Sequence, residues 1–357
     1  MATSAMASTI IVDVLHKVVG RQDLTREEAY TVMKFLMTGQ AADAEIAAFL
    51  TAMRMKGETV EELTGFAQVM REKVVSVPTK YSSDRAVPPD HILVDTCGTG
   101  GDAKGTFNIS TIAAFVVAGA RIPVAKHGNR SVSGRCGSAD AIEALGIPLD
   151  LAPERVGQCI DEVGIGFLFA PLLHPAMHHV MSARRQIRIR TLFNILGPLT
   201  NPAGAAAQVV GVSEGGLTEV LADVLNRLGC RRAFVVHGEE GLDEISTVGE
   251  TKISEVTEGQ VRTYYVRPED FGMRRATLAD LQGGDAPTNA GIIRGILRGS
   301  RGPRRDIVLV NAGAAIAAGG GARDIGEGIA AAERSLQSGA AWEKLEKVVA
   351  FCERLRK

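Results

Sequence analysis

Residues 94–111 read VDTCGTGGDAKGTFNIST, and an apolar run at 92–94 leads into them. Gly98, Gly100 and Gly101 permit unusual backbone angles and let a ligand approach the main chain closely. Their amide groups can point at phosphate oxygens, and the helix start expected at 108–111 also favours anions. The stretch therefore predicts a strand, a glycine-rich loop and a helix, which form either a phosphate-binding loop or an ordinary tight turn.

Asp102 lies inside this loop, where a carboxylate repels a phosphate that approaches it directly. The loop is not a Walker loop, because no Gly-Lys-Ser or Gly-Lys-Thr follows the glycines. It also lacks the last glycine of the dinucleotide-binding GxGxxG pattern. Any ligand assigned to the loop must therefore account for Asp102 as well as for the glycines.

The composition of the 357-residue chain favours an α/β enzyme, since 45% of the residues are hydrophobic, only 4% are aromatic and 40 are glycine. After residue 90, short apolar runs alternate with helical stretches, which predicts βα units. The predicted strands are 92–94, 123–125, 208–211, 233–236 and 307–310. We expect an α/β protein with a small all-helical domain plus a large α/β domain with a mainly parallel central sheet.

Residues 10–75 carry helical patterns. Thr25 and Glu28 have the spacing of a capping box, as have Thr59 and Glu62, and a further helix is predicted over 42–56. Linker residues follow at 77–83 and 87–90, and a basic amphipathic stretch at about 172–196 favours helix over strand. The expected domains are 1–80 with about 172–196, and 81–171 with 197–357.

Charge and cysteine usage exclude several classes of protein. The formal net charge of −1 argues against general binding of nucleic acid. The five cysteines contain no CxxC pair, so neither a zinc site nor a disulfide framework is indicated. The first residues lack the features of a secretory signal, and no apolar run of about eighteen residues predicts a membrane span. We expect a cytoplasmic protein with no membrane and no nucleic-acid partner.

A second polar motif, KHGNRSVSGRCGSAD, occupies 126–140 and follows a short apolar strand at 122–125. It gathers Lys126, His127, Asn129 and Arg130 with several serines and glycines, which is a dense set of donors for an anion carrying several charges. A solvated surface loop is the alternative. Two such loops after neighbouring strands indicate a ligand with two separate anionic groups.

A third motif, VVHGEEGLDEIS, ends the strand predicted at 233–236 and contains Asp243 and Glu244. Adjacent carboxylates suit Mg²⁺, which takes oxygen ligands and bridges phosphates. A helix N-terminus decorated with acids is the competing interpretation, and on local sequence it is slightly favoured.

Arginines and histidines between 174 and 190 supply further candidates. One or two of Arg184, Arg185, Arg188 and Arg190 can hold a carboxylate in a bidentate pair, whereas the rest form a solvated face. His174 and His178 have the spacing of a zinc pair, but no third ligand or HExxH context accompanies them, which disfavours zinc.

Six ordered blocks together resemble the anthranilate phosphoribosyltransferase family of tryptophan biosynthesis. They are GTGGD at 98–102, NIST at 108–111, KHGNRSVS at 126–133, GSAD at 137–140, RTLFNILGPLTNP at 190–202 and GLDEIS at 241–246. The resemblance covers about 10–350. It implies a small helical and a large α/β domain with the active site between them, a homodimer, and Mg²⁺ as cofactor.

The resemblance also implies the reaction and the residues that serve it. Anthranilate is joined to 5-phosphoribosyl 1-pyrophosphate and pyrophosphate is released, which fits a ligand with two anionic groups. The implied donor-binding residues are Gly98, Gly101, Asp102, Thr106, Asn108, Ile109, Ser110, Thr111, Lys126, His127, Gly128, Asn129, Arg130, Ser131, Val132, Ser133, Gly134 and Ser138. The implied anthranilate-binding residues are Gly98, Asn129, Arg184, Gly197 and Pro198, with His127 nearby, and the implied metal-binding residues are Ser110, Asp243 and Glu244.

On this hypothesis Asp102 accepts hydrogen bonds from ribose hydroxyls or metal-bound water, and a cation between it and pyrophosphate reverses the repulsion. Breaking the C1–O bond places negative charge on pyrophosphate, which Mg²⁺, loop amides and Lys126 are expected to stabilise. Positioning of the anthranilate amine supplies much of the rate. No residue is a convincing general base; His127 is the one candidate, and a binding role suits it better.

The chain departs from the family pattern at four positions. Gly134 and Cys136 stand where serines are common, and Ala103 and Arg188 stand where glycine is common. Two alternatives remain: a pyrimidine nucleoside phosphorylase of the same fold, and a non-catalytic relative that binds nucleic acid. The first requires phosphate-dependent cleavage of a nucleoside, and the second requires salt-dependent DNA binding.

Overall fold

The computed structural model describes residues 2–81, 92–131 and 135–356. The chain divides into a helical unit, Met1–Val75 with Pro171–Thr200, and an α/β unit, Ser76–Ala170 with Asn201–Lys357. These boundaries differ by a few residues from the expected 80, 172 and 196. The Val77 amide donates to the Pro202 carbonyl inside the α/β unit (3.0 Å), whereas Arg71 donates to the Leu199 carbonyl inside the helical unit (2.7 Å).

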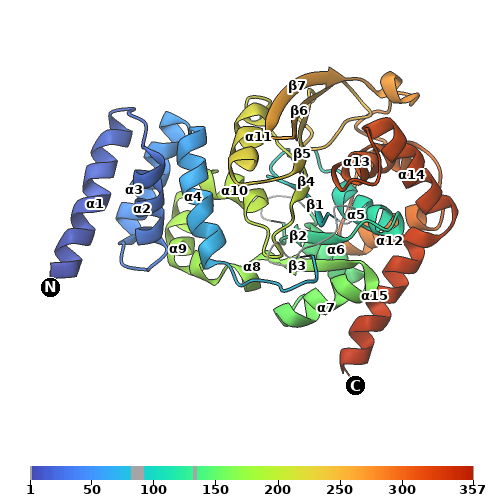
Figure 1. The fold of residues 1–357 in the computed structure, drawn as a ribbon, viewed down its shortest axis with the longest axis horizontal. Helices are drawn as coiled ribbons and strands as arrows, with labels where there is room; N and C mark the ends of the chain where they lie inside the picture. Colours follow the sequence, from blue (N-terminus) through green and yellow to red (C-terminus); the bar gives the residue numbers. More distant parts are fainter. Residues whose placement is uncertain (1, 82–91, 132–134, 357) are drawn as a thin grey trace. The chain divides into compact units, whose positions relative to one another are not determined.

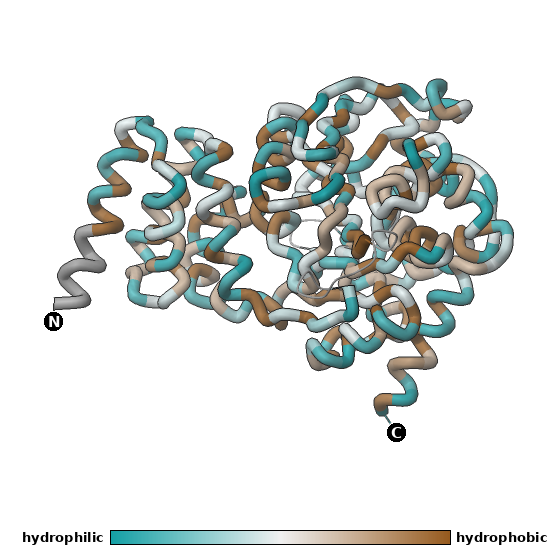
Figure 2. The backbone as a smooth tube through the Cα atoms, viewed as in Figure 1, coloured by the Kyte–Doolittle hydropathy of each residue, from teal (hydrophilic) through white to brown (hydrophobic). Residues whose placement is uncertain are grey.

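Short helices build the helical unit. They are α1 (Ala2–Val19), α2 (Arg26–Leu36), α3 (Asp43–Lys56), α4 (Val60–Lys73), α8 (Ala170–Leu173, which begins one residue before the unit), η1 (Pro175–Met177), α9 (His178–Ile187), α10 (Leu192–Leu196) and η2 (Gly197–Leu199). Both predicted capping boxes are present, since the side chains of Thr25 and Thr59 accept from the amides of Glu28 and Glu62. Figure 2 shows hydrophilic and hydrophobic segments alternating along these helices, as amphipathic helices require.

The stretch at 172–196 is helical as predicted, but it is interrupted. Pro175 opens the 3₁₀ turn η1, and Arg188 closes α9 in the left-handed conformation with φ of 54°. Proline and a left-handed residue both stop an α-helix. A basic amphipathic pattern alone does not reveal these interruptions.

The α/β unit contains a sheet of seven strands in the order β3-β2-β1-β4-β5-β6-β7. The strands are β1 (Val94–Gly98), β2 (Val124–Gly128), β3 (Ile165–Phe169), β4 (Ala207–Gly211), β5 (Arg232–Gly238), β6 (Thr251–Thr257) and β7 (Gln260–Val266). Strands β1 to β5 pair in parallel, and β6 and β7 continue the sheet antiparallel. The mainly parallel sheet is therefore confirmed.

Helices cover both faces of this sheet. They are α5 (Ile109–Gly119), α6 (Ser138–Ala144), α7 (Pro153–Val163), α11 (Leu217–Arg227), η3 (Pro268–Phe271), α12 (Ala286–Leu297), α13 (Pro303–Ala318), α14 (Ile325–Gln337) and α15 (Ala340–Arg356). Figure 1 shows α11 on one side of the sheet, with α5, α13 and α14 on the other. The main hydrophobic core lies between α5, α13 and the central strands. None of the helices in the described ranges is long and apolar enough to cross a membrane.

The strand predicted at 307–310 is wrong, because these residues lie inside α13. Every residue from Ile307 to Ala318 in this helix is buried. A helix that is apolar on all sides has no polar face, so a short piece of it reads like a buried strand.

Candidate functional site

The carboxyl ends of β1 and β4 meet at the point where the chain changes direction across the sheet. From β1 the chain adds β2 and β3 on one side, and it then returns to add β4 and β5 on the other. In open α/β sheets ligands bind outside the strand ends at such a switch point. Gly98 and Gly211, the last residues of β1 and β4, are direct partners here.

The glycine-rich loop begins within β1 and not after it, since Asp95, Thr96, Cys97 and Gly98 continue the strand beyond the predicted end. Gly100 and Gly101 have φ of 64° and 82°, the left-handed region that favours glycine. The Thr99 amide donates to the Gly211 carbonyl (2.8 Å), which ties the start of the loop to β4. The expected loop therefore stands at the switch point.

Asp243 packs into the same place. The Gly100 amide donates to Asp243 Oδ2 (3.1 Å). A Cβ at Gly98 would stand 2.6 Å from that same oxygen, and a Cβ at Gly211 would stand 1.6 Å from the Asp243 carbonyl oxygen. Position 211 must therefore be glycine because the Asp243 backbone lies across it, whereas a Cβ at position 98 would push the Asp243 carboxylate aside.

Glu244 reaches the start of α5, where the Ser110 amide donates to its Oε1 (3.2 Å). The segment 239–250 contains turns and bends and no helix, so the alternative of an acid-decorated helix N-terminus is not what the structure has. The structure therefore brings together the three expected metal-binding residues, Ser110, Asp243 and Glu244. The Ser110 amide bonds to Glu244, and the neighbouring Asp243 lies against Gly98.

The electrostatics of the carboxylates fit a divalent cation. Burial and the charge of Asp102 raise the pKa of Asp243 to about 6, and burial and Asp243 raise that of Glu244 well above its usual value. Oδ2 of Asp102 is buried and accepts no hydrogen bond from any described residue. The described ranges contain no cluster of three or more His, Cys, Asp or Glu arranged as a metal site. Mg²⁺ needs fewer protein ligands, because it keeps waters and bridges phosphates.

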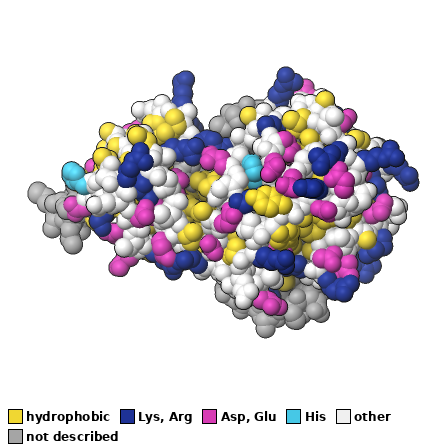
Figure 3. All heavy atoms as spheres, turned by 90° about the horizontal axis from the view of Figure 1, so that it is seen from above, with side chains coloured by type: hydrophobic (Ala, Val, Ile, Leu, Met, Phe, Trp, Pro, Cys, Tyr) yellow, Lys and Arg dark blue, Asp and Glu magenta, His cyan; other side chains and the backbone are white. Residues whose placement is uncertain are grey.

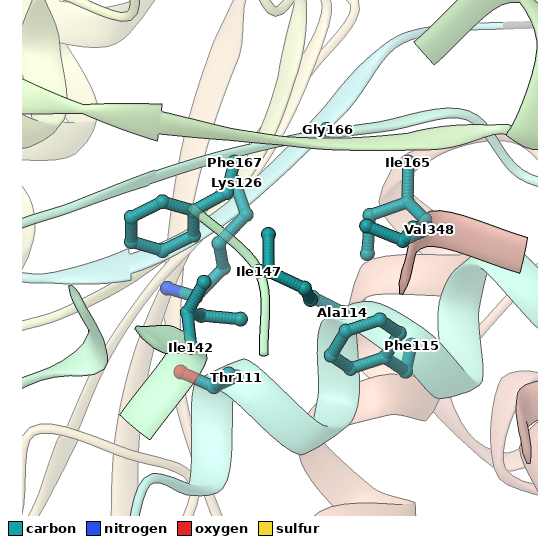
Figure 4. A pocket seen from close by; sticks show the side chains of 10 residues that line it. All are labelled: Thr111, Ala114, Phe115, Lys126, Ile142, Ile147, Ile165, Gly166, Phe167 and Val348. Atoms are coloured by element: carbon teal, nitrogen blue, oxygen red, sulfur yellow. The ribbon is translucent and has the colours of Figure 1, made fainter. Parts of the chain in front are cut away.

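Lys126 and Thr111 point into the interior of the α/β unit. Figure 4 shows both side chains among apolar neighbours such as Phe167, and only 3% of Lys126 and 1% of Thr111 are exposed. The Lys126 ammonium donates to the Thr96 carbonyl, and its charge opposes the rise in the pKa of Glu244. In this structure Lys126 therefore acts as a buried counter-charge beneath the loops.

A buried network fixes the end of β2, from which the second polar motif departs. Asp95 accepts from the His127 amide (3.1 Å) and from the side chain of Asn201 (2.8 Å). Asn201 also donates to the Ala125 carbonyl (2.9 Å). His127 is itself buried, with 6% exposed. The sequence analysis missed Asp95 and Asn201, although Asn201 belongs to the RTLFNILGPLTNP block.

Asp140 organises the second donor loop. Its carboxylate accepts from the amides of Gly137 (2.8 Å) and Ser131 (3.2 Å), and it pairs with Arg130 (2.8 Å). Hydrogen bonds to Glu143 and Asp140 raise the pKa of Arg130, and the negative charges of these two acids balance its positive charge. Three of the expected donor-binding residues, Val132, Ser133 and Gly134, lie outside the described residues.

Two other expected donor-binding positions in this loop are in direct contact. A Cβ at Gly128 would stand 2.3 Å from the Ser138 hydroxyl, and that hydroxyl donates to the Asn129 carbonyl (3.3 Å). The end of β2 and the start of α6 therefore approach so closely that any Cβ at position 128 would force the Ser138 hydroxyl to move. Asn129 itself is exposed.

Arg184 differs from its neighbours in the helical unit. Its guanidinium stacks on Phe193 at 5.2 Å, and burial lowers its pKa. Within the described residues Arg184 forms no salt bridge, whereas Arg185 and Arg188 are exposed. Gly197 and Pro198 form the turn η2 of the same unit. A stacked guanidinium without an acidic partner suits a carboxylate ligand.

The histidines of this unit do not form a zinc site in the described part of the chain. Burial lowers the pKa of His174 to about 4, and the His178 ring contacts the Pro175 carbonyl at 2.7 Å.

Sequence comparison defines the class of protein first. The family model described as "Glycosyl transferase family, a/b domain" matches residues 90–342, and "Glycosyl transferase family, helical bundle domain" matches 12–74. The first region covers most of the α/β unit together with the second stretch of the helical unit, and the other lies within the first stretch of the helical unit. The fold and the switch-point loops are therefore those of a two-domain glycosyltransferase.

Relatives specify the family further. The anthranilate phosphoribosyltransferase of Moorella thermoacetica is 55% identical over 95% of this chain and 97% of its own length. The crystal structure of the enzyme of that name from Thermus thermophilus has a TM-score of 0.87 at 43% identity, covering 96% of this chain and 99% of that one. That from Saccharomyces cerevisiae in complex with PRPP and Mg has a TM-score of 0.86 at 26% identity, covering 96% and 98%. The chain belongs to the anthranilate phosphoribosyltransferase family.

Proposed function

We propose that the protein transfers the phosphoribosyl group of 5-phosphoribosyl 1-pyrophosphate to the amine of anthranilate, releasing pyrophosphate, in tryptophan biosynthesis. The observation that carries this proposal is the convergence of Gly98, Gly100, Asp243 and Glu244 at the switch point of the sheet. The relatives named above, at more than half identity for one of them, bear the name of this activity.

The donor is held by the two loops that follow β1 and β2. The amides of the glycine-rich loop and the start of α5 supply hydrogen-bond donors and a helix N-terminus for phosphate oxygens. Asp102 lies among these amides with a buried oxygen that no described residue satisfies. Ribose hydroxyls or metal-bound water are the donors this oxygen suits.

The metal is held by Asp243 and Glu244, with Ser110 beside them. When bound, Mg²⁺ neutralises charge on the pyrophosphate leaving group. The protein's own part is to keep both carboxylates in place through the amides of Gly100 and Ser110. Burial raises the pKa of both acids, Asp102 raises that of Asp243 further, and Asp243 raises that of Glu244 further, so a bound cation would stabilise their ionised forms.

Arg184 holds the carboxylate of anthranilate. Its guanidinium is already ordered by stacking on Phe193, so less side-chain freedom is lost when a carboxylate binds. Gly98, Asn129, Gly197 and Pro198 are assigned to anthranilate on the family resemblance alone. The amine then attacks C1 of the ribose as the C1–O bond to pyrophosphate breaks, and orientation of the two substrates lowers the barrier. We assign no general base, and the proton that the amine loses when the N–C1 bond forms passes to solvent water.

The two alternatives lack support. The relatives named above bear the name of a phosphoribosyltransferase, and this name supports neither alternative. On the face seen in Figure 3, Lys and Arg are interspersed with Asp and Glu, whereas a nucleic-acid surface gathers positive charge. We also infer a homodimer from the family resemblance, which sedimentation of the purified protein tests.

Anthranilate fluorescence tests the proposed function. We expect the signal of anthranilate to disappear only when the donor and Mg²⁺ are both present. Asp243→Asn with Glu244→Gln should abolish turnover, and Arg184→Ala should raise the KM for anthranilate more than Arg184→Lys. Wild-type protein that binds the donor but leaves anthranilate unchanged would show that the acceptor is wrong, and pyrimidine nucleosides with phosphate would then be assayed.

A further inference from the structure

Asn108 immediately precedes α5, yet its side chain does not cap the helix. Its Nδ2 donates to the Cys136 carbonyl (3.3 Å), and its Oδ1 accepts from Asn289 Nδ2 (2.9 Å). The Cys136 thiol also approaches Oδ1, at 3.6 Å. Asn108 thus connects the glycine-rich loop with the second donor loop and with α12.

Asn289 uses both ends of its amide in this arrangement. It is 1% exposed, and its Oδ1 accepts from the Gly284 amide (2.7 Å) while its Nδ2 faces Asn108. An amide side chain has one accepting and one donating end. Because Asn289 occupies the accepting end of Asn108, the donating end must turn toward Cys136.

Residues 281–284, which precede α12, also bond to the glycine-rich loop. The Gly283 amide donates to the Gly105 carbonyl (2.9 Å), and the Phe107 amide donates to the Leu281 carbonyl (3.2 Å). A Cβ at Gly283 would stand 2.8 Å from the Phe107 backbone and 2.9 Å from Asn289 Oδ1. The loop and Asn289 are therefore packed against one short strap, 281–284.

We propose that Asn289 is a positioning residue for donor binding, which orients Asn108 and thereby holds the loop at 99–107 and the residues at 135–138 before α6 in one arrangement. The proposal rests on the proposed function, because only there do Asn108 and the two loops bind the donor. A site whose parts are already ordered loses less freedom on binding and binds more tightly. Asn289 is buried behind Asn108 and acts through it.

Calorimetric titration of the full-length protein with 5-phosphoribosyl 1-pyrophosphate and Mg²⁺ tests this role. We expect Asn289→Ala to weaken donor binding roughly threefold to tenfold, the usual worth of one hydrogen bond. Asn289→Asp keeps the shape and the bond from Gly284 but faces Asn108 with a second acceptor, so it should weaken binding at least as much. The KM for anthranilate at saturating donor should stay unchanged in both variants.

The matched control is Asn226→Ala, which removes an amide that donates to the Gly259 carbonyl (2.9 Å) on the opposite side of the sheet from α12. It should bind the donor like wild type. Circular dichroism identifies a temperature at which every variant is folded. If Asn289→Ala does not fold, the donor titration is made with Asn289→Asp.

A double-mutant cycle separates the proposed role from a general structural one. If Asn289 acts through Asn108, Asn108→Ala with Asn289→Ala should bind the donor no more weakly than Asn108→Ala alone. Multiplied effects, or wild-type donor binding by both Asn289 variants while Asn108→Ala is impaired, would overturn the proposal and leave the proposed function intact. Wild-type donor binding by Asn108→Ala would instead remove Asn108 from the donor site and the inference with it.

Discussion

The Asp243 carboxylate lies directly against the last residue of β1, since a Cβ at Gly98 would stand 2.6 Å from its Oδ2. Real Cβ contacts are never this short, and the atom that must yield is the end of a side chain. Gly98→Ala should therefore fold but displace the carboxylate. We expect the Mg²⁺ concentration for half-maximal activity to rise roughly tenfold to a hundredfold, as for other groups that orient metal ligands.

Gly216→Ala is the matched control for this variant, because a Cβ there meets nothing within 4 Å and its φ is −69°. Its Mg²⁺ dependence should equal that of wild type. An unchanged Mg²⁺ requirement in Gly98→Ala would show that Asp243 can hold the cation from another rotamer, and the glycine would then serve only the ligand.

Mg²⁺ binding should depend on pH through Asp243, whose pKa burial and Asp102 raise from 3.8 to about 6. This carboxyl and that of Glu244, whose pKa is also raised, must lose their protons to bind a cation, so the apparent affinity for Mg²⁺ should fall by at least about tenfold per pH unit below 6. Without metal, the folded state holds the Asp243 proton more tightly than the unfolded state. That contribution to stability is present below about pH 3.8 and is lost as the pH rises through 6.

Asp102→Asn tests the assigned cause of this shift. Removing the neighbouring charge should lower the pKa of Asp243 and move the Mg²⁺-binding profile to lower pH. Calorimetric titration with Mg²⁺ alone, at several pH values, measures both profiles. A profile that is identical in the two proteins would mean that burial alone sets the pKa.

Ala103 and Arg188, two of the departures from the family pattern, both adopt left-handed backbone, with φ of 53° and 54°. This conformation costs a residue with a Cβ about 1–2 kcal/mol, which glycine avoids. The gain in stability from glycine is smaller than this cost, because glycine loses more conformational entropy on folding. Ala103→Gly and Arg188→Gly should each stabilise the protein by about 0.5–1 kcal/mol in urea unfolding.

Ala120→Gly provides the comparison, since Ala120 has a negative φ of −77° and gains no relief. It should lose stability where the other two variants gain it. Destabilisation by Ala103→Gly would mean that the Ala103 methyl makes contacts worth more than its backbone strain.

Cys136→Ser should tighten or preserve donor binding, by up to about threefold. A thiol is a weak hydrogen-bond donor, and the Cys136 Sγ stands 3.6 Å from Asn108 Oδ1. A hydroxyl there would make a stronger bond to the same oxygen. Calorimetric titration with the donor measures the change, with Cys136→Ala as the comparison that removes the group. Equal affinities of the serine and alanine variants would show that this contact contributes nothing.

The sequence was sufficient where local chemistry decides the structure. The capping boxes at Thr25 and Thr59 and the glycines of the first loop have local signatures, and the structure has the predicted elements there. The sequence was insufficient for α13, because a helix that is buried on all sides lacks the alternation of polar and apolar residues that identifies a surface helix. Strand β3 was missed because its five residues follow α7 directly, with only Gly164 between them.

Contacts between distant residues also escaped the sequence analysis. Asp95 lies 106 residues from Asn201, and Asn108 lies 181 residues from Asn289. Nothing in the spacing of such residues indicates that they meet, because the fold alone brings them together. Asp95 directly follows the apolar run 92–94, which is the one such signal among these four residues, and it does not indicate which residue is its partner.

The helical unit is built from two separate stretches of chain, and this affects how the protein can form during synthesis. Asp43 in α3 accepts hydrogen bonds from Ser182 and Gln186 in α9. Part of the surface of the first 75 residues therefore stays uncovered until the ribosome has synthesised β1, β2 and β3 and then the second stretch, Pro171–Thr200. Strands β4 and β5 are synthesised later still. Neither unit can therefore finish folding before part of the other has been synthesised.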